Sequence, residues 1–76
     1  MEFELLEVVV LLNAIERHNL KSGDLGTVVE VYDGGLEVEF VTADGKTQAV
    51  VTLDTTDVRK VQNSDMIAVR SVQPTH

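Results

Sequence analysis

The amino-acid sequence predicts an all-β fold, a small five-stranded barrel followed by a C-terminal extension. Short valine-rich segments recur along the chain, and β-branched residues favour extended backbone. Turn-forming residues separate these segments, most clearly Asp33 and Gly34, a pair that is typical of tight hairpins. The length of 76 residues corresponds to one domain, and few aromatic side chains are available to its core.

The first predicted strand covers residues 5–12, which are apolar at almost every position. Successive β-branched residues favour a strand, while a helix over residues 3–18 stays an alternative because its apolar residues would share one face. A strand that is apolar on both faces is normally covered on both. We therefore expect the tail, a second copy of the chain or a partner protein to cover its outward side chains. These are either the set that contains Val8 and Val10 or the alternate set.

Residues 13–25 are predicted to form a long surface loop. Its apolar side chains Ile15, Leu20 and Leu25 are expected to anchor the loop to the core. Loops that a rigid scaffold positions in this way often carry binding residues.

The turn before the second strand contains Gly23, Asp24 and Gly26. Glycine adopts backbone angles that other residues resist, so both glycines are expected to shape this turn, and a positive φ at Gly26 would make substitution there costly. The second strand then covers residues 26–32. A glycine-containing turn, a valine-rich strand and a tight hairpin in succession are typical of SH3-like barrels.

The third predicted strand, residues 36–41, follows the hairpin turn at Asp33 and Gly34 and alternates cleanly between apolar and polar residues. Its glutamates, Glu37 and Glu39, are expected to face water. The side chains expected to face the core are Leu36, Val38 and Phe40.

The fourth predicted strand, residues 47–53, follows a turn at residues 43–46. Residues 54–57 are predicted to form one helical turn with Asp54 as its N-cap. A short fifth strand at residues 58–61 would then close the barrel. The side chains of the fourth strand expected to face the core are Ala49, Val51 and Leu53.

The C-terminal tail, residues 62–76, begins with polar residues and continues with an apolar stretch at residues 66–72. This pattern leaves two alternatives, an extra edge strand or a disordered end. The large apolar side chains favour docking, and the outward face of the first strand is one candidate for it.

The chain is acidic, with a net charge of −7 from 6 basic and 13 acidic residues. This balance opposes binding to nucleic-acid phosphates and to anionic membranes. It suits a basic protein partner, and it also keeps a protein soluble. The chain has no cysteine, and its first residues are acidic where a signal peptide would be basic, so we expect a cytoplasmic location.

The sequence predicts neither an active site nor a site for a metal or cofactor. The two histidines, His18 and His76, have no cysteine with which to make a typical ligand spacing. The two glycines before the second strand lack the lysine and the following helix of a phosphate-binding loop. Glu37 and Glu39 project from one face of a strand, where a solvated acidic patch is expected.

Residues 20–31, with their Gly-Thr-Val-Val-Glu-Val block, and residues 36–40 resemble a family of short bacterial proteins, domain of unknown function 4926. The resemblance also includes residues 44–47 and 51–53, and it extends over residues 5–61. It implies an SH3-like, KOW-like barrel. It also implies an antitoxin or immunity role, because some members are thought to be encoded beside toxin-like genes. The family supplies no established catalytic or binding residues.

We therefore expect a non-catalytic protein-binding module that acts by occupying a partner protein. A self-associating structural domain, in which the first strand pairs with its symmetry mate in a homodimer, is one alternative. KOW-like nucleic-acid binding is another. An edge strand could also accept a strand from the partner. The residues expected at the partner interface are Val8, Val10, Arg17, His18, Glu37 and Glu39.

Overall fold

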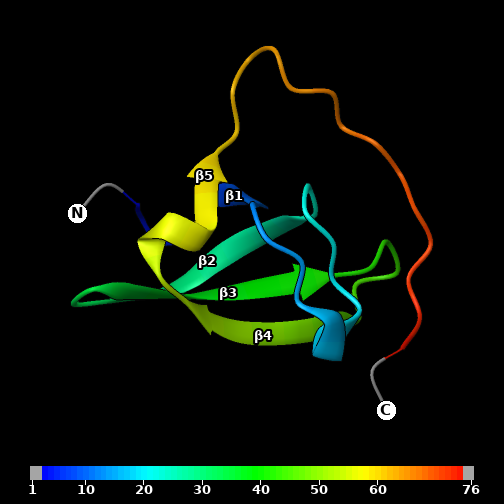
Figure 1. The fold of residues 1–76 in the computed structure, drawn as a ribbon, viewed down its shortest axis with the longest axis horizontal. Helices are drawn as coiled ribbons and strands as arrows, with labels where there is room; N and C mark the ends of the chain where they lie inside the picture. The colour runs from blue at the N-terminus through cyan, green and yellow to red at the C-terminus, as the bar shows by residue number, and fades with distance from the viewer. Residues whose placement is uncertain (1–2, 75–76) are drawn as a thin grey trace.

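The structure, a computed structural model, describes residues 3–74 and contains one antiparallel sheet with the strand order β4-β3-β2-β1-β5. Its strands are β1 (Val8–Leu11), β2 (Leu25–Tyr32), β3 (Gly35–Val41), β4 (Thr47–Leu53) and β5 (Val58–Lys60). The sheet curls, so that β1 and β5 lie across from β3 and β4 (Figure 1). The prediction of a small, barrel-like all-β domain with five strands is confirmed, whereas its SH3-like classification stays a prediction.

β1 is shorter than predicted because the chain turns at Leu5 and Leu6 before the strand begins. Leu6 has a φ of 68°, in the left-handed region that a strand does not contain. Its N–H donates to the carbonyl of Val28 at 2.6 Å, which ties this turn to β2. The helical alternative over residues 3–18 is wrong, because β1 pairs with β2 on one side and with β5 on the other.

The loop between β1 and β2 contains a short 3-10 turn, η1 (Glu16–His18), which the sequence did not predict. Leu20 is buried and Ile15 packs against the core, as expected. The prediction for Leu25 is wrong, because this residue begins β2 opposite Val10 and its side chain is exposed. Side chains alternate along a strand, so a strand that turns Gly26 and Val28 inward must turn Leu25 outward.

β2, β3 and β4 form two consecutive hairpins, as predicted. Tyr32 pairs with Gly35 across the first turn, where Gly34 has a φ of 90°. Gly45, with a φ of 84°, lies in the second turn. Bulges interrupt both ladders and bend the strands. The predicted inward side chains are all buried: Leu36, Val38, Phe40, Ala49, Val51 and Leu53.

The predicted helical turn after β4 is the 3-10 turn η2 (Thr55–Asp57), with Asp54 as its N-cap. The Asp57 carboxylate accepts the Asp54 N–H at 3.0 Å, which secures the entry to the turn. β5 follows directly and pairs with β1. Within residues 3–74 no ladder joins β5 to β4, so hydrogen bonds do not close the barrel as we expected of the fifth strand.

The core fills the inside of the curled sheet. Val9 and Leu11 of β1 and Val28 of β2 are fully buried in it, and Phe3 adds an aromatic ring from the segment before β1. Each fully buried side chain of this kind stabilises the fold by about 1.5–3 kcal/mol relative to exposure. The core is thus mainly aliphatic, as the small number of aromatic residues suggests.

The two glycines that were expected to shape the turn before the second strand have different structural roles. Gly23 has a φ of 97°, as expected of a glycine that shapes a turn. Gly26 does not have a positive φ, so the conformational role considered for it is wrong. It lies inside β2, where a β-carbon would be 2.5 Å from Val38 Cγ1. Close packing therefore explains this glycine.

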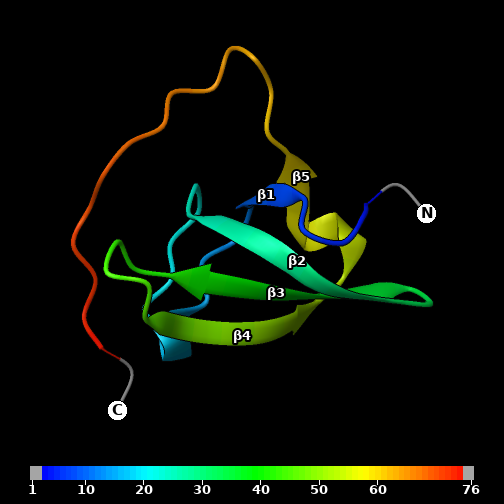
Figure 2. The same ribbon diagram turned by 180° about the vertical axis from the view of Figure 1, so that it is seen from behind.

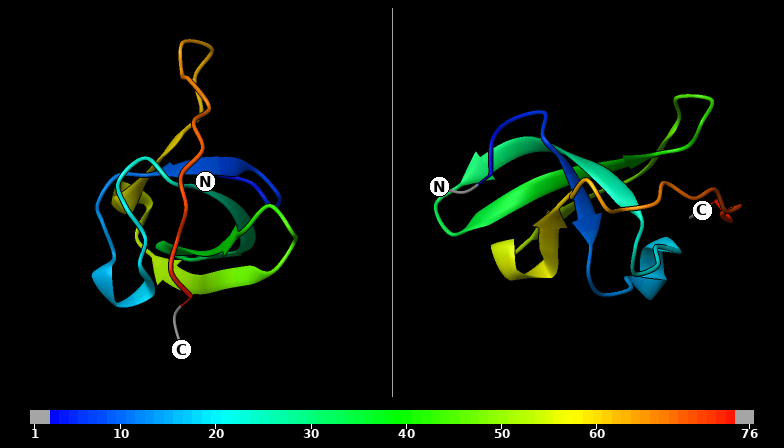
Figure 3. Two further views of the ribbon diagram at one scale, coloured as in Figure 1. Left: turned by 90° about the vertical axis from the view of Figure 1, so that its right-hand side faces the viewer. Right: turned by 90° about the horizontal axis from the view of Figure 1, so that it is seen from above.

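The C-terminal tail leaves β5 and runs to residue 74 without a strand or a helix (Figures 1 and 2). The extra edge strand considered for it is absent from its described part, residues 62–74. Seen from the side, the tail spans the molecule from β5 to the level of β4 (Figure 3). It makes specific contacts with the rest of the chain at its two ends.

Candidate binding surface

The pairing of β1 decides which of its side chains point outward. Val9 and Leu11 belong to the core, so Val8 and Val10 lie on the outer face of the sheet. Val8 is 45% exposed, whereas Val10 is only 6% exposed. Of these two predicted contact residues, Val8 therefore offers surface to a partner and Val10 does not.

Val8 begins a row of side chains that crosses the outer face. Thr27 lies opposite Val8, Glu39 lies opposite Thr27, and Val50 lies opposite Glu39. Residues directly opposite one another in antiparallel strands project from the same face. Val50 is 47% exposed. The row thus presents the Glu39 carboxylate between two exposed valines.

Two further glutamates extend this surface. Glu37 lies two residues from Glu39 on β3, and Glu30 lies opposite Glu37 on β2. The Tyr32 hydroxyl donates to Glu37 Oε1 at 3.0 Å, and this hydrogen bond raises the pKa of Tyr32 because the carboxylate favours the protonated phenol. The Thr47 hydroxyl likewise donates to Glu39 Oε2 at 2.6 Å. Neutral hydroxyl groups therefore orient two of the carboxylates.

These glutamates have no ionic partner within residues 3–74. We call Glu30, Glu37, Glu39, Val8 and Val50 the acidic face. Like charges directly opposite in a sheet are unfavourable, and Glu30 and Glu37 are such a pair. The ion pairs of the described residues are all elsewhere: Lys46–Asp44, Arg59–Asp65, Lys60–Glu7 and Arg70–Asp24.

Arg17 and His18 lie on η1, apart from the acidic face. Arg17 borders a small cavity of about 170 Å³ together with Val51 and Leu53, whose side chains face the core. The carbonyl of His18 accepts a hydrogen bond from Gln48 Nε2 at 3.1 Å, which fixes η1 beside the start of β4. The structure therefore divides the predicted interface into two separate regions.

No group of three His, Cys, Asp or Glu side chains is arranged to hold a metal ion between residues 3 and 74. The second histidine of the sequence, His76, lies outside the described residues. Between residues 3 and 74, no helix is long and apolar enough to cross a membrane.

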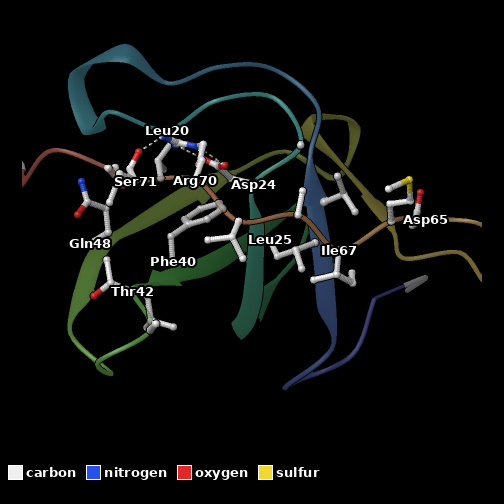
Figure 4. A pocket seen from close by; sticks show the side chains of 18 of the residues that line it. Leu20, Asp24, Leu25, Phe40, Thr42, Gln48, Asp65, Ile67, Arg70 and Ser71 are labelled. Carbon is white, nitrogen blue, oxygen red and sulfur yellow. Dashed lines mark hydrogen bonds and ion pairs between the residues drawn. The ribbon is translucent and has the colours of Figure 1, made fainter.

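The sequence reasoning missed a second site, which joins the tail to the loop before β2 (Figure 4). The Arg70 guanidinium binds the Asp24 carboxylate through both oxygens, with Nε 2.8 Å from Oδ1, and it also donates to the Asn19 carbonyl at 3.0 Å. The Asp24 carboxylate accepts the Lys21 N–H at 2.8 Å as well. Burial raises the pKa of Asp24, but these hydrogen bonds and the charge of Arg70 outweigh it and lower the pKa.

Two amide side chains hold the end of the tail beside Arg70. Asn19 Nδ2 donates to the carbonyls of Gln73 and Pro74, at 3.1 and 3.3 Å. Gln48 Nε2 donates to the Gln73 carbonyl at 2.8 Å. We call these contacts, together with the Arg70–Asp24 pair, the tail latch.

The beginning of the tail is held by a local ion pair. Arg59 on β5 binds both oxygens of Asp65 at 2.9 Å. Asp65 also accepts the Gln62 N–H at 2.6 Å. The hydrogen bonds from Arg59 and Gln62 lower the pKa of Asp65 to about 2.

Between its two held ends the tail passes over a cavity of about 620 Å³ (Figure 4). Val10, Leu25 and Val41 border it on the sheet, and Ile67 and Val72 border it on the tail. The tail thus lies over the outward face of β1 near Val10, one of the places considered for its docking, but leaves space beneath it.

Comparison with known proteins gives one match. No curated protein and no solved structure matches the chain. A family model, described as a domain of unknown function (DUF4926), matches residues 5–60. This range contains all five strands, the acidic face and Asp24, and it ends before the tail. The chain therefore belongs to the DUF4926 family.

Proposed function

We propose that this protein is a non-catalytic protein-binding module whose acidic face occupies a basic surface of a partner protein. One observation carries the proposal: Glu30, Glu37 and Glu39 share an open sheet face and have no ionic partner within residues 3–74. Lysine or arginine side chains of a partner would supply the missing positive charge. The exposed valines of the acidic face would supply apolar contact area.

The distribution of basic side chains supports a protein partner over a nucleic acid. Of the 6 basic residues, Lys46, Arg59, Lys60 and Arg70 already form ion pairs with carboxylates. Binding to a phosphate backbone needs a cluster of cationic side chains on one surface. The acidic face would instead repel phosphates, which disfavours the KOW-like alternative.

The form of this function that we favour is antitoxin-like or immunity-like, in the cytoplasm of a bacterium. The module would bind a basic, toxin-like protein and cover the surface with which that protein acts. The support for this form is the resemblance of residues 20–31 and 36–40 to the family, some of whose members are thought to be encoded beside toxin-like genes.

Charge reversal on the acidic face tests the proposal. The variant Glu37→Lys/Glu39→Lys inverts two charges of the face, and the control Glu4→Lys/Glu16→Lys makes the same change in net charge at exposed residues elsewhere. Each protein is used to capture partners from lysate of its source organism with chemical cross-linking. The captured partner is then purified, and its affinity for each variant is measured.

We expect wild type and control to bind the partner alike and the acidic-face variant to bind at least about tenfold more weakly. Thermal unfolding of each variant establishes that the fold is retained. The proposal is overturned if the partner binds the acidic-face variant as tightly as wild type. An equal loss of affinity in the acidic-face variant and in the control would also contradict the proposal, because the change in net charge alone would then explain the weaker binding.

A further inference from the structure

The tail is held only at its two ends. Asp65 pairs with Arg59 at its beginning, and the tail latch holds Arg70 and Gln73 at its end. Between these points, the backbone groups of residues 66–69 make no hydrogen bond with any other described residue. The middle of the tail is therefore an extended segment whose backbone donors and acceptors are free.

The large apolar side chains of this segment are mostly exposed as well. Met66 is 91% exposed, Ile67 is 67% exposed and Val69 is 99% exposed, although all three are apolar. The cavity of about 620 Å³ separates the tail from the sheet below it. Extended backbone with free polar groups and apolar side chains is the kind of segment to which another strand adds. Docking within one chain thus satisfies the ends of the tail, while its middle borders the cavity with unpaired backbone groups and largely exposed apolar side chains.

The latch joins residues that are far apart along the chain. Arg70 and Asp24 are 46 residues apart, whereas Arg59 and Asp65 are only 6 apart. Residues 61–69 span about 30 Å when extended. The tail can therefore place Arg70 on Asp24 of a neighbouring copy when that aspartate lies within this distance of the end of β5.

We propose that two copies of this chain exchange their tails. Arg70 of each copy pairs with Asp24 of the other, and the two Met66–Val69 segments run antiparallel beside each other at the two-fold axis. The exchange re-forms every contact of the tail latch. It also pairs backbone groups that are free in the single chain and brings the apolar side chains of the two segments into cross-strand contact. These added contacts favour the dimer, while the loss of translational freedom makes it concentration-dependent.

Charge complementation tests whether the latch forms between chains. Asp24→Arg places two arginines at the latch, and Arg70→Asp places two aspartates there, so neither variant can form it alone. In an exchanged dimer of the two variants, both latches are complete: Arg70 meets Asp24, and the aspartate introduced at residue 70 meets the arginine introduced at residue 24. If the latch forms only within one chain, mixing the two variants restores no latch, and the solution masses stay as they are for each variant alone.

The measurement is the solution mass of each variant, of the equimolar mixture and of wild type over a dilution series. We expect two-chain masses for wild type and for the mixture, and single-chain masses for each variant alone. A mixture that keeps the single-chain mass at the highest concentration overturns the proposal, as does either variant forming the dimer alone. The control pair Glu4→Arg and Arg17→Asp, exposed residues outside the latch, is expected to dimerise like wild type both alone and mixed.

A second variant tests the pairing of the tail segments. Val69→Lys places a charged side chain opposite Met66 of the other copy, in an otherwise apolar contact, so we expect the dissociation constant of the dimer to rise at least about tenfold. Leu5→Lys, at another exposed apolar residue, is the control. An unchanged dissociation constant for Val69→Lys contradicts the antiparallel arrangement. The acidic-face variant Glu37→Lys/Glu39→Lys is expected to dimerise normally, so this proposal and the proposed function fail independently.

Discussion

The backbone of Gly26 in β2 lies against the ring of Phe40 in β3. A β-carbon at residue 26 would lie 2.8 Å from Phe40 Cε1 and 2.5 Å from Val38 Cγ1, closer than real β-carbons approach other atoms. Both neighbours are buried in a close-packed core and have little freedom to move away. Residue 26 is therefore glycine because the core has no space for a side chain.

We predict that Gly26→Ala lowers the free energy of unfolding by about 1–3 kcal/mol, the usual cost of overpacking a core. Removing the nearest obstacle should relieve this cost, so Gly26→Ala/Val38→Ala should cost less than the sum of the two single variants. Denaturant unfolding of the four proteins measures this coupling. Thr52→Ala, at an exposed residue of β4, is the control and should change stability by less than about 0.5 kcal/mol. Strict additivity of Gly26→Ala and Val38→Ala would contradict the packing explanation.

The features that the sequence predicted correctly depend on local patterns. Alternation with period two identified Leu36, Val38 and Phe40 as core residues of β3, because Glu37 and Glu39 occupy the positions between them. The glycines of the two hairpin turns and the capped turn after β4 also follow from short-range preferences. Such signals require only a few consecutive residues, so one sequence suffices to find them.

The features that the sequence reasoning missed depend on residues that meet only in the folded chain. Arg70 and Asp24 are 46 residues apart, and no periodicity links them. The bulge between Val28 and Glu30, which shifts the register between β2 and β3, was not predicted either. At Leu6, a turn interrupts an apolar run whose composition favours a strand. Long-range contacts and local exceptions of this kind can be identified only when the folded structure is known.

Glu37 is predicted to control the titration of Tyr32. The hydrogen bond from the Tyr32 hydroxyl to Glu37 is the main cause of its raised pKa, and the charges of Glu37 and Glu30 add to it. Glu37→Gln should therefore lower the pKa of Tyr32 toward the usual value of about 10. The chain has 1 tyrosine and no tryptophan, so tyrosinate absorbance reports this group alone. Glu39→Gln is the control, and an unchanged pKa in Glu37→Gln would exclude the hydrogen bond in solution.

The beginning of the tail is predicted to detach in acid. The pKa of Asp65 is about 2 when it is bound to Arg59, compared with 3.8 for a free aspartate. Because the bound form has the lower pKa, the ion pair contributes fully above about pH 4 and is lost as the pH falls through about 2. The pKa of Asp24 is also lowered, so protonation of Asp24 should likewise weaken the tail latch as the pH falls.

Amide chemical shifts of residues 66–69, followed from neutral to acid pH, measure this release. Val38 and Val51, buried in the sheet, serve as internal reference amides. Asp65→Asn should detach the beginning of the tail at neutral pH and remove the part of the acid transition that comes from Asp65. If the shifts of Asp65→Asn match those of wild type at neutral pH, the Arg59–Asp65 pair does not hold the tail.

Glycine at residue 6 is predicted to stabilise the fold. Leu6 has a φ of 68° and is 74% exposed, so its side chain loses little by removal while its backbone is in a region that costs about 1–2 kcal/mol for most residues. Greater freedom of the unfolded chain offsets about 0.4–1 kcal/mol of that gain. Leu6→Gly should therefore raise the free energy of unfolding by roughly 0.5–1 kcal/mol. Leu5→Gly is the matched control, because Leu5 is 58% exposed without a positive φ, and it should lower stability. Destabilisation by Leu6→Gly to the same extent as by Leu5→Gly would mean that the Leu6 side chain stabilises the turn before β1.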